Sequence, residues 1–319
     1  MVRRRPSCLA FKMFILLIFL FMLSTSASAQ IHPSEPGVNL GDTSFLDALG
    51  GPGWLVEEMA DGYHSDEIVD SSGRTTATPS INSFISLTHA AWTSNHKILH
   101  AWYGAEVLVI SGYVHSGIQG SSGGLSTVIV SPLILQWGER KIGRIPVYQR
   151  VVFDFFLPVG EYQRSSIVNV SSHLFSANPY YAITALPAKH WEASWRIHYL
   201  WNAVNHSPPL PDEVCSTQAG QAVHFNATAS REFPHGVWIG ANGYYLKQIT
   251  DSQVNGAPVA DSREQVGAIG PGAVWDLGQF MLFANAYHEL GVVNRPKGEK
   301  LVIRISWLPG RKVFHGDAN

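Results

Sequence analysis

The chain has 319 residues and a formal net charge of −2, and charged residues make up 14% of it, against about 25% in an ordinary soluble domain. This balance gives no electrostatic basis for binding nucleic acid. Of the two cysteines, Cys8 falls in an expected signal peptide and Cys215 stands alone in the mature chain, which excludes a small disulfide-held domain and a cysteine metal site. Low charge, 11% aromatic residues and a mean hydropathy of only +0.03 are typical of a membrane β-barrel, because alternating apolar and polar positions cancel in the average.

Residues 1–29 have the three parts of a secretory signal peptide. Arginines at 3–5 precede the apolar run Met13–Leu23, and Ala27–Ala29 supplies the small residues of a cleavage site before Gln30. The alternative is an uncleaved anchor, but this run is short for a membrane helix, which needs about 20 apolar residues. No later stretch reaches about 18 consecutive apolar residues, so we expect no membrane-spanning helix in the mature protein.

Residues 30–53 are rich in Pro, Gly and Asp and show little periodicity. Phe45, Leu46 and Leu49 are apolar residues of this segment with no predicted strand to join. We hypothesise that residues 30–53 form a separate N-terminal segment that folds into the periplasmic mouth of a barrel as a hatch.

Residues 54–308 contain about twelve stretches with the period-two alternation of β-strands. In chain order, the expected strands are Trp54–Tyr63, Ile81–Ala91, Ile98–Ile110, Leu125–Trp137, Val147–Leu157, Tyr180–Leu186, Trp191–Trp201, Gln218–Ser230, Gly236–Gln248, Arg263–Trp275, Gly278–Glu289 and Glu299–Leu308. Residues 309–319 form a C-terminal tail.

The stretch Trp191–Trp201 shows the pattern most clearly. Its apolar face carries aromatic residues at both ends with Ala193 and Ile197 between them, as in a strand that crosses a bilayer between two aromatic girdles. Taken alone, the stretch also fits a half-buried strand of a soluble sandwich. The residues expected in lipid-facing girdles are Trp191, Trp195, Tyr199, Trp201 and Trp307.

The connections between the expected strands alternate between long and short. Long ones are expected near 64–78, 112–124, 158–175, 202–217, 249–261 and 290–298, and short turns near 93–96, 187–190 and 276–277. An even strand count with long loops on one side and short turns on the other is the pattern of bacterial outer-membrane barrels, whose long loops face outside and whose termini are periplasmic. The fold class predicted is therefore an all-β, transmembrane, antiparallel up-and-down β-barrel of about 12 strands. A soluble Greek-key sandwich has no reason to alternate in this way.

The face opposite the predicted lipid face carries most of the charges. A lipid-facing Arg or Lys near the bilayer midplane costs about 2–4 kcal/mol, so these residues should face the lumen and pair there. We expect Arg196 to pair with an acidic residue of a neighbouring strand. The alternative is a polar interior with no transport role. The residues expected to line the lumen are Glu106, Arg150, Asp154, Glu192, Arg196, His198, His224, Asn226, Asn285, Tyr287, Glu289 and Arg304.

Several dispersed stretches resemble the meta-pathway phenol-degradation family of Gram-negative outer-membrane proteins. The resemblance implies an outer-membrane barrel, often associated with uptake of aromatic compounds, and no agreed catalytic residues. The chain departs from the family at 125–127 and 169–173, in or beside expected outward loops. The matching stretches are Asp154–Gly160 with Tyr162, Asn178–Pro187, Leu200–Asn202 with Asn205, Gly240–Asp251, Ala268–Pro271, Asn294–Gly298 and, more weakly, Thr43–Gly53.

The sequence gives little support for catalysis or metal binding. A lipolytic enzyme would need a serine with a histidine, but pairs such as His115–Ser116 and His206–Ser207 are expected by chance in a chain with 14 histidines. No HxH or HExxH spacing occurs, so we expect no metal and no cofactor. The function predicted is passive uptake of small hydrophobic or aromatic compounds by a barrel without enzyme activity in the outer membrane of a Gram-negative bacterium. The expected partners are outer-membrane lipid, the solute and the barrel-assembly machinery. The alternatives are a non-transporting structural barrel and, third, a lipolytic enzyme.

Overall fold

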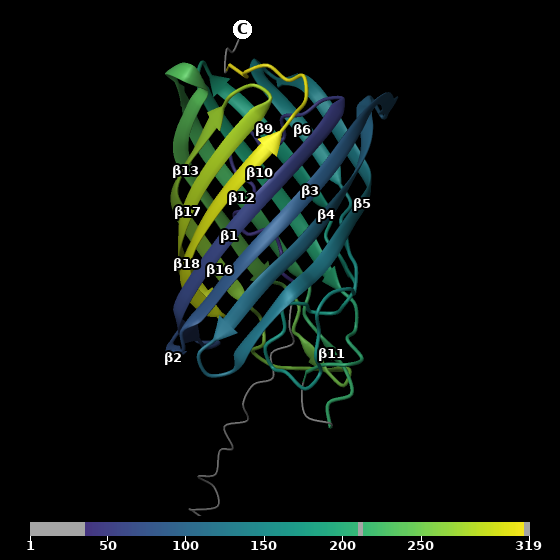
Figure 1. Cartoon of the computed structure of the whole chain (residues 1–319), viewed down its shortest axis with the longest axis vertical. Coiled ribbons are helices and arrows are strands. Elements are labelled where there is room, and N and C mark those ends of the chain that lie inside the picture. Colours follow the sequence, from purple (N-terminus) through teal and green to yellow (C-terminus); the bar gives the residue numbers. More distant parts are fainter. Residues whose placement is uncertain (1–35, 210–212, 316–319) are drawn as a thin grey trace, which may run out of the picture. The chain divides into compact units, whose positions relative to one another are not determined.

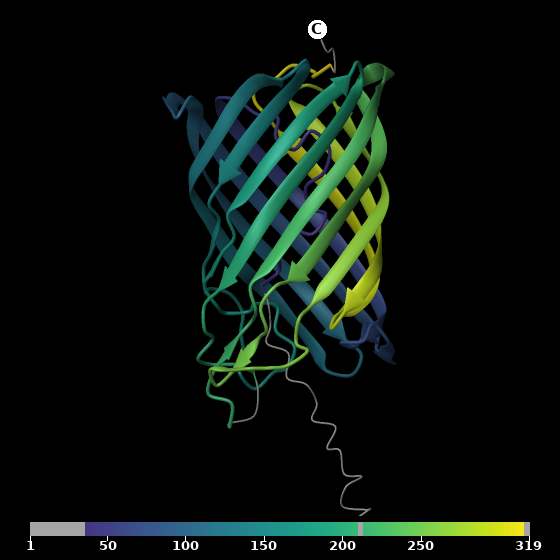
Figure 2. The ribbon, with the colours of Figure 1, turned by 180° about the vertical axis from the view of Figure 1, so that it is seen from behind.

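The computed structural model describes residues 36–209 and 213–315, so the expected signal peptide lies outside the described residues. Within these ranges, twelve long antiparallel strands form a closed barrel (Figures 1 and 2), and the predicted fold class is confirmed. The ring closes where the first strand pairs with the last, with Val56 opposite Trp307. In order around the barrel, the long strands are β1 (Gly53–Val69), β3 (Ile81–Ile98), β4 (Ala101–Ser116), β5 (Gly120–Ile142), β6 (Ile145–Val152), β9 (Tyr180–Ala188), β10 (Trp191–Asn202), β12 (Ala222–Phe233), β13 (Val237–Gln248), β16 (Gln265–Asp276), β17 (Phe280–Val293) and β18 (Pro296–Trp307).

The two ends of the barrel differ. One end, lower in Figure 1, carries the long connections, and the other end carries short turns and the C-terminal tail. Among the described residues, no helix is long and apolar enough to cross a membrane. The short elements are β2 (Thr75–Ala77), β7 (Phe155–Phe156), β8 (Ser176–Ala177), β11 (Thr217–Gln218), β14 (Gln253–Val254), β15 (Ala257–Pro258) and the 3₁₀ turn η1 (Pro234–Gly236).

Period-two alternation sets the two faces of the wall. In β10, the side chains of Glu192 and Arg196 are buried inside the barrel, whereas Trp195 between them is 60% exposed on the outside. Trp195 stacks on Phe225 of the neighbouring strand β12, with 6.2 Å between ring centroids. The side chains of β10 thus alternate between an apolar outer face and a largely polar inner face, as the pleat of a strand requires them to alternate.

Three predicted connections are wrong because polar or glycine-rich stretches belong to strands. The expected turn at 93–96 is a register shift within β3, and the chain reverses at Leu99 and His100, both with positive φ. The expected loop 290–298 is reduced to the turn Asn294–Arg295, where asparagine takes the positive φ that such tight turns require.

The third error is the expected loop 112–124. β4 runs to Ser116 and β5 begins at Gly120, so the turn is three residues long. The glycines leave room for the connection after β7, because a Cβ on Gly124 would lie 2.4 Å from Cγ of Glu161. The expected strand Val147–Leu157 is also interrupted, between Val152 and Phe155.

Several strands extend well past their predicted ends. β1 runs to Val69 instead of Tyr63, and β5 has 23 residues and runs to Ile142 instead of Trp137. A strand beyond the apolar band needs no apolar face, so the alternation of hydropathy that marks a membrane strand fades before the strand ends.

Candidate functional site: the lumen and the segment inside it

The described part of the N-terminal segment, residues 36–52, lies inside the barrel, where the purple chain is visible between the strands in Figure 1. Backbone atoms of the segment bond to side chains of the wall on several strands. The Gly41 amide donates to Oδ1 of Asn226 at 2.9 Å, and the Tyr287 hydroxyl donates to the Gly41 carbonyl at 2.7 Å. The Ala48 amide donates to Oγ1 of Thr184 at 2.9 Å. These bonds satisfy backbone groups of a segment that has no strand pairing of its own.

Two acidic residues of the segment form ion pairs with the wall. Nε of Arg196 lies 2.7 Å from Oδ2 of Asp47, and Nζ of Lys300 lies 2.7 Å from Oδ1 of Asp42. Lys300 also lies 2.6 Å from Asp61 of β1. Arg196 pairs with an acidic residue in the lumen, as expected, but its partner Asp47 belongs to the segment inside the barrel and not to a neighbouring strand.

Apolar residues of the segment also pack on the wall. Phe45 and Leu46 are almost fully buried in one cluster with Trp238, Val274 and Phe283. Full burial of a side chain of this size contributes about 1.5–3 kcal/mol. Hydrogen bonds, ion pairs and apolar contacts together hold residues 36–52 against the wall, in addition to the chain connection to β1 at Gly53.

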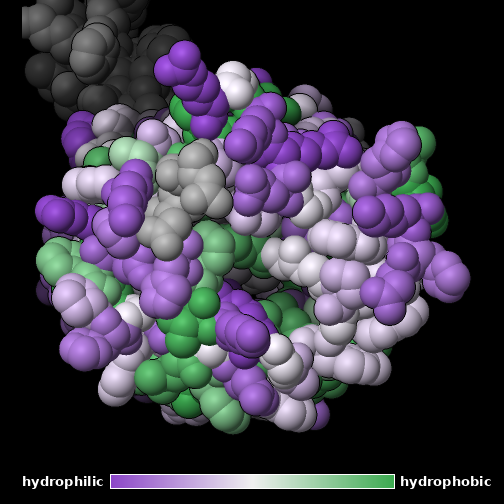
Figure 3. All heavy atoms as spheres, turned by 90° about the horizontal axis from the view of Figure 1, so that it is seen from above, coloured by the Kyte–Doolittle hydropathy of each residue, from purple (hydrophilic) through white to green (hydrophobic). Residues whose placement is uncertain are grey.

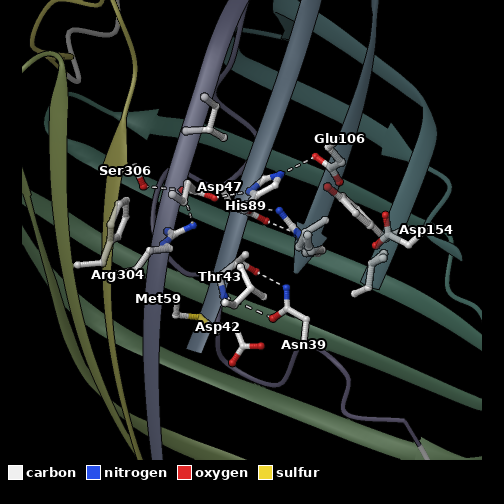
Figure 4. Close-up of a pocket in the computed structure, with 18 of the residues that line it drawn as sticks. Asn39, Asp42, Thr43, Asp47, Met59, His89, Glu106, Asp154, Arg304 and Ser306 are labelled. Carbon is white, nitrogen blue, oxygen red and sulfur yellow. Dashed lines mark hydrogen bonds and ion pairs between the residues drawn. The ribbon is translucent and has the colours of Figure 1, made fainter. Parts of the chain in front are cut away.

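A second polar network spans β1, β3, β4 and β18. His89 lies between two carboxylates, with Nδ1 2.8 Å from Glu57 and Nε2 3.0 Å from Glu106. Glu57 also accepts from Arg304 at 3.2 Å and from the Ser306 hydroxyl (Figure 4). Glu57, His89, Glu106 and Arg304 on this side of the lumen therefore form one connected polar network.

The inner face is apolar where β3, β4, β5 and β7 meet. Ile110, Ile129 and Phe156 form a buried cluster with Leu87 and Leu108 packed against it. A cavity of about 130 Å³ lies between this cluster, the polar network and the N-terminal segment. We call Leu87, Leu108, Ile110, Ile129 and Phe156 the apolar wall.

A second cavity, of about 460 Å³, lies at the end with short turns. The C-terminal tail borders it: Arg311 bonds to the buried Asp276 at 2.8 Å, and the Phe314 ring lies 6.1 Å from Trp238 and 6.3 Å from Tyr148. Viewed onto this end, the rim of the barrel is largely polar (Figure 3).

The residues expected in the lumen all point inward, but several hold other groups instead of lining open space. Glu192 accepts from Ser194 and Ser230, and Glu289 accepts from the hydroxyls of Tyr63 and Tyr244. The twelve residues are Glu106, Arg150, Asp154, Glu192, Arg196, His198, His224, Asn226, Asn285, Tyr287, Glu289 and Arg304. Of these, Glu106, Arg150, Asp154, Arg196, His198 and Arg304 border the 130 Å³ cavity.

The five residues expected in girdles lie on the outer face, each at least 37% exposed: Trp191, Trp195, Tyr199, Trp201 and Trp307. Four further lumen residues were not predicted from the sequence: Asp42, Asp47, Glu57 and His89. For Glu57 and His89 a signal existed, since both stand at inward positions of β1 and β3. For Asp42 and Asp47 no pattern existed, because they lie outside any strand. Among the described residues, no group of three or more His, Cys, Asp or Glu side chains converges as a metal site would.

Solved structures of outer-membrane barrels are similar to this chain, and one of them shares its architecture. The crystal structure of the COG4313 outer membrane channel from Pseudomonas putida F1 superimposes with a TM-score of 0.73 at 14% identity, covering 85% of this chain and 100% of that chain. The translocator domain of the autotransporter NalP from Neisseria meningitidis matches with a TM-score of 0.48 at 9% identity, covering 82% of this chain and 90% of that chain. The first likeness, at this identity, shows the fold alone.

Comparison with curated proteins gives no match. The model of one protein family, described as "Putative MetA-pathway of phenol degradation", matches residues 65–305. This range holds most of the barrel and excludes the segment inside it. The predicted resemblance is confirmed, and the chain belongs to this family of phenol-degradation proteins.

Proposed function

We propose that this barrel stands in the outer membrane of a Gram-negative bacterium and lets small hydrophobic or aromatic compounds pass without enzymatic turnover. The observation that carries the proposal is the 130 Å³ cavity between the apolar wall and the N-terminal segment. An apolar inner surface beside this cavity favours an apolar solute, because transfer of apolar area out of water is favourable. The family description, which names phenol degradation, supports the same class of solute.

The outer face supports the membrane location. Its aromatic side chains include Trp195 at 60% and Trp307 at 43% exposure, and Ile197 between two aromatic residues is 48% exposed. An apolar band of this kind would be a large exposed apolar patch in water, whereas it is what a bilayer requires. Outer-membrane lipid and, during biogenesis, the barrel-assembly machinery are the partners that follow.

Residues 36–52 act as the hatch in this proposal. They fill the lumen in the closed state, and they leave the apolar wall accessible when the two ion pairs to Arg196 and Lys300 break. Both pairs lie where side chains are mostly buried, so removing one partner of either pair would leave a buried charge without compensation. If the segment never moved, the same contacts would make a permanently closed barrel with a structural role. Measurements of solute flux distinguish this structural barrel from a channel.

The test is solute flux into liposomes that contain the purified barrel. We expect phenol and toluene to enter liposomes that contain the barrel faster than they enter protein-free liposomes. A disaccharide, with a mass similar to that of a large phenol, should enter the two kinds of liposome at the same rate. Flux of the sugar at the rate of the aromatic compounds would mean a general porin. Absence of flux for every solute would support the structural barrel, and release of fatty acid from the lipid would reveal a lipolytic enzyme.

A further inference from the structure

The C-terminal tail, of which residues 309–315 are described, crosses the end of the barrel that carries the short turns (Figures 1 and 2). The tail leaves the wall after Trp307, the last residue of β18. The centroid of its Phe314 ring lies 6.1 Å from that of Trp238 in β13 and 6.3 Å from that of Tyr148 in β6. In the ring of strands, β16 and β17 separate β18 from β13, and β9, β10 and β12 separate β13 from β6. The tail therefore spans the opening of the barrel and does not follow one edge of it.

A buried carboxylate of the wall anchors the tail. The side chain of Asp276, the last residue of β16, has no exposed surface, and it accepts from both terminal nitrogens of Arg311 at 2.8 Å. The backbone amide of Phe314 donates to the same carboxylate at 2.9 Å. Such bidentate, charge-assisted hydrogen bonds are the strong ones in proteins. One wall residue thus fixes both the start of the tail and the position of the Phe314 ring.

The anchored tail packs against the hatch. Phe45 and Leu46 of the hatch are 1% and 4% exposed in a cluster with wall residues, and Phe314 of the tail packs against this cluster. Leu49, further along the hatch, packs against it too. The tail therefore covers the apolar residues of the hatch at the end with the short turns. Removal of the Phe314 ring exposes part of this cluster to water, which is unfavourable.

The tail and the hatch are not packed together along their whole length. Residues 49–52 of the hatch border the 460 Å³ cavity on one side, and residues 308–311 with Phe314 border it on another. Protein interiors contain few voids larger than a water molecule. A cavity of this volume leaves room for the hatch to shift toward this end once the tail has moved.

We infer that residues 309–315 are a strap that locks the hatch in the lumen. While Asp276 holds the strap, the hatch keeps its apolar contacts, and release of the strap frees the hatch to move toward the end with the short turns. The inference rests on the assignment of residues 36–52 as the hatch and goes beyond the proposed function, because it names a second segment that controls the first.

The test measures hydrogen exchange of the hatch by mass spectrometry in the purified full-length barrel in detergent. Phe314→Ala removes the ring and keeps the backbone bond to Asp276. We expect exchange within residues 36–52 to become about tenfold faster, because the burial of part of one aromatic ring is lost. Exchange within β13 should stay unchanged, since the strap controls the hatch and not the wall.

A second variant and a matched control separate the anchor from the charge. Arg311→Ala removes the anchor and should also speed exchange of the hatch. Lys312→Ala removes the same charge at the next, exposed position and should exchange like the unmodified protein. If Arg311→Ala fails to fold because Asp276 loses its partner, Phe314→Ala leaves this ion pair intact and decides alone, with heat-modifiable migration on gels as the check of folding.

Unchanged exchange of the hatch in every folded strap variant would overturn the strap. Equally faster exchange in β13 and in the hatch would also overturn it, because the tail would then stabilise the whole barrel. Faster exchange of the hatch alone, with no phenol flux into liposomes, would support the strap and contradict the proposed passage. Unchanged exchange together with phenol flux in the unmodified protein would overturn the strap and leave the proposed function standing.

Discussion

At the scale of single residues, the inner face of the barrel depends on pairs that join the wall to the segment inside it. Arg196 and Asp47 are separated by 149 positions in the chain, and their side chains are only 9% and 5% exposed. Loss of one partner of a buried pair leaves the other charge without compensation, at a cost of about 3–5 kcal/mol.

Replacing Arg196 with Ala should therefore lower the unfolding temperature and release the segment around Asp47. We expect faster trypsin cleavage within residues 36–52 and a higher single-channel conductance. The double variant Arg196→Ala with Asp47→Ala removes the unpaired charge and should recover part of the thermal stability. An Arg196→Ala protein with unchanged melting and unchanged cleavage would show that this pair does not hold the segment.

For the residue that follows Arg196, on the opposite face of the strand, we predict an effect on membrane assembly. Ile197 is 48% exposed on the outer face, and an arginine near the bilayer midplane costs about 2–4 kcal/mol. Ile197→Arg should block membrane assembly, whereas the control Ile197→Leu should assemble normally, as measured by heat-modifiable migration on gels. Normal insertion of Ile197→Arg together with failed insertion of Arg196→Ala would mean that the two faces are reversed.

At the scale of elements, the period-two alternation of apolar and polar residues predicts the strands. Polar stretches inside strands, however, resemble connections. Thr93–His96 reads as a turn because its residues are polar, but Oγ of Ser94 donates to the His96 carbonyl at 3.3 Å within a bulge of β3. Local composition cannot separate a bulge from a turn, because both place polar groups where the ladder is interrupted. The strand count and the order of the strands are insensitive to this error.

The N-terminal segment is the element with the largest expected effect on transport. Deleting residues 31–50 removes Asp42 and Asp47 with their ion pairs and opens the lumen along its length. We expect a large rise in single-channel conductance in planar bilayers and a loss of discrimination between aromatic compounds and sugars. Unchanged conductance would contradict the assignment of this segment as the hatch.

At the scale of the whole molecule, the proposed orientation places the long connections outside the cell. Cys215 is exposed and lies in the connection between β10 and β12, so a membrane-impermeant maleimide should label it in intact cells without any mutation. In a Cys215→Ser background, Lys189→Cys in the turn between β9 and β10 should label only after the outer membrane is disrupted. Labelling of Lys189→Cys but not of Cys215 in intact cells would mean that the proposed orientation of the barrel is reversed.

The contents of the lumen could not be predicted from the sequence to the same extent as its wall. The inward orientation of a wall residue such as Glu192 can be predicted from the alternation of polar and apolar residues around it. Asp42, by contrast, meets Lys300 across 258 positions of chain, and nothing in the sequence near either residue encodes that contact. The cavity beside Phe156 depends on how this segment folds, so its volume could not be inferred from the sequence.

We propose that apolar solutes pass through the barrel when residues 36–52 move away from the wall. A disulfide between Ala48→Cys and Thr184→Cys, in a Cys215→Ser background, would tether the segment where the Ala48 amide now bonds to Thr184. Phenol flux into liposomes should fall to the rate of protein-free liposomes in the oxidised protein and recover on adding reductant, while the two single-cysteine proteins should respond to neither treatment. Equal phenol flux in the oxidised and the reduced protein would contradict the claim.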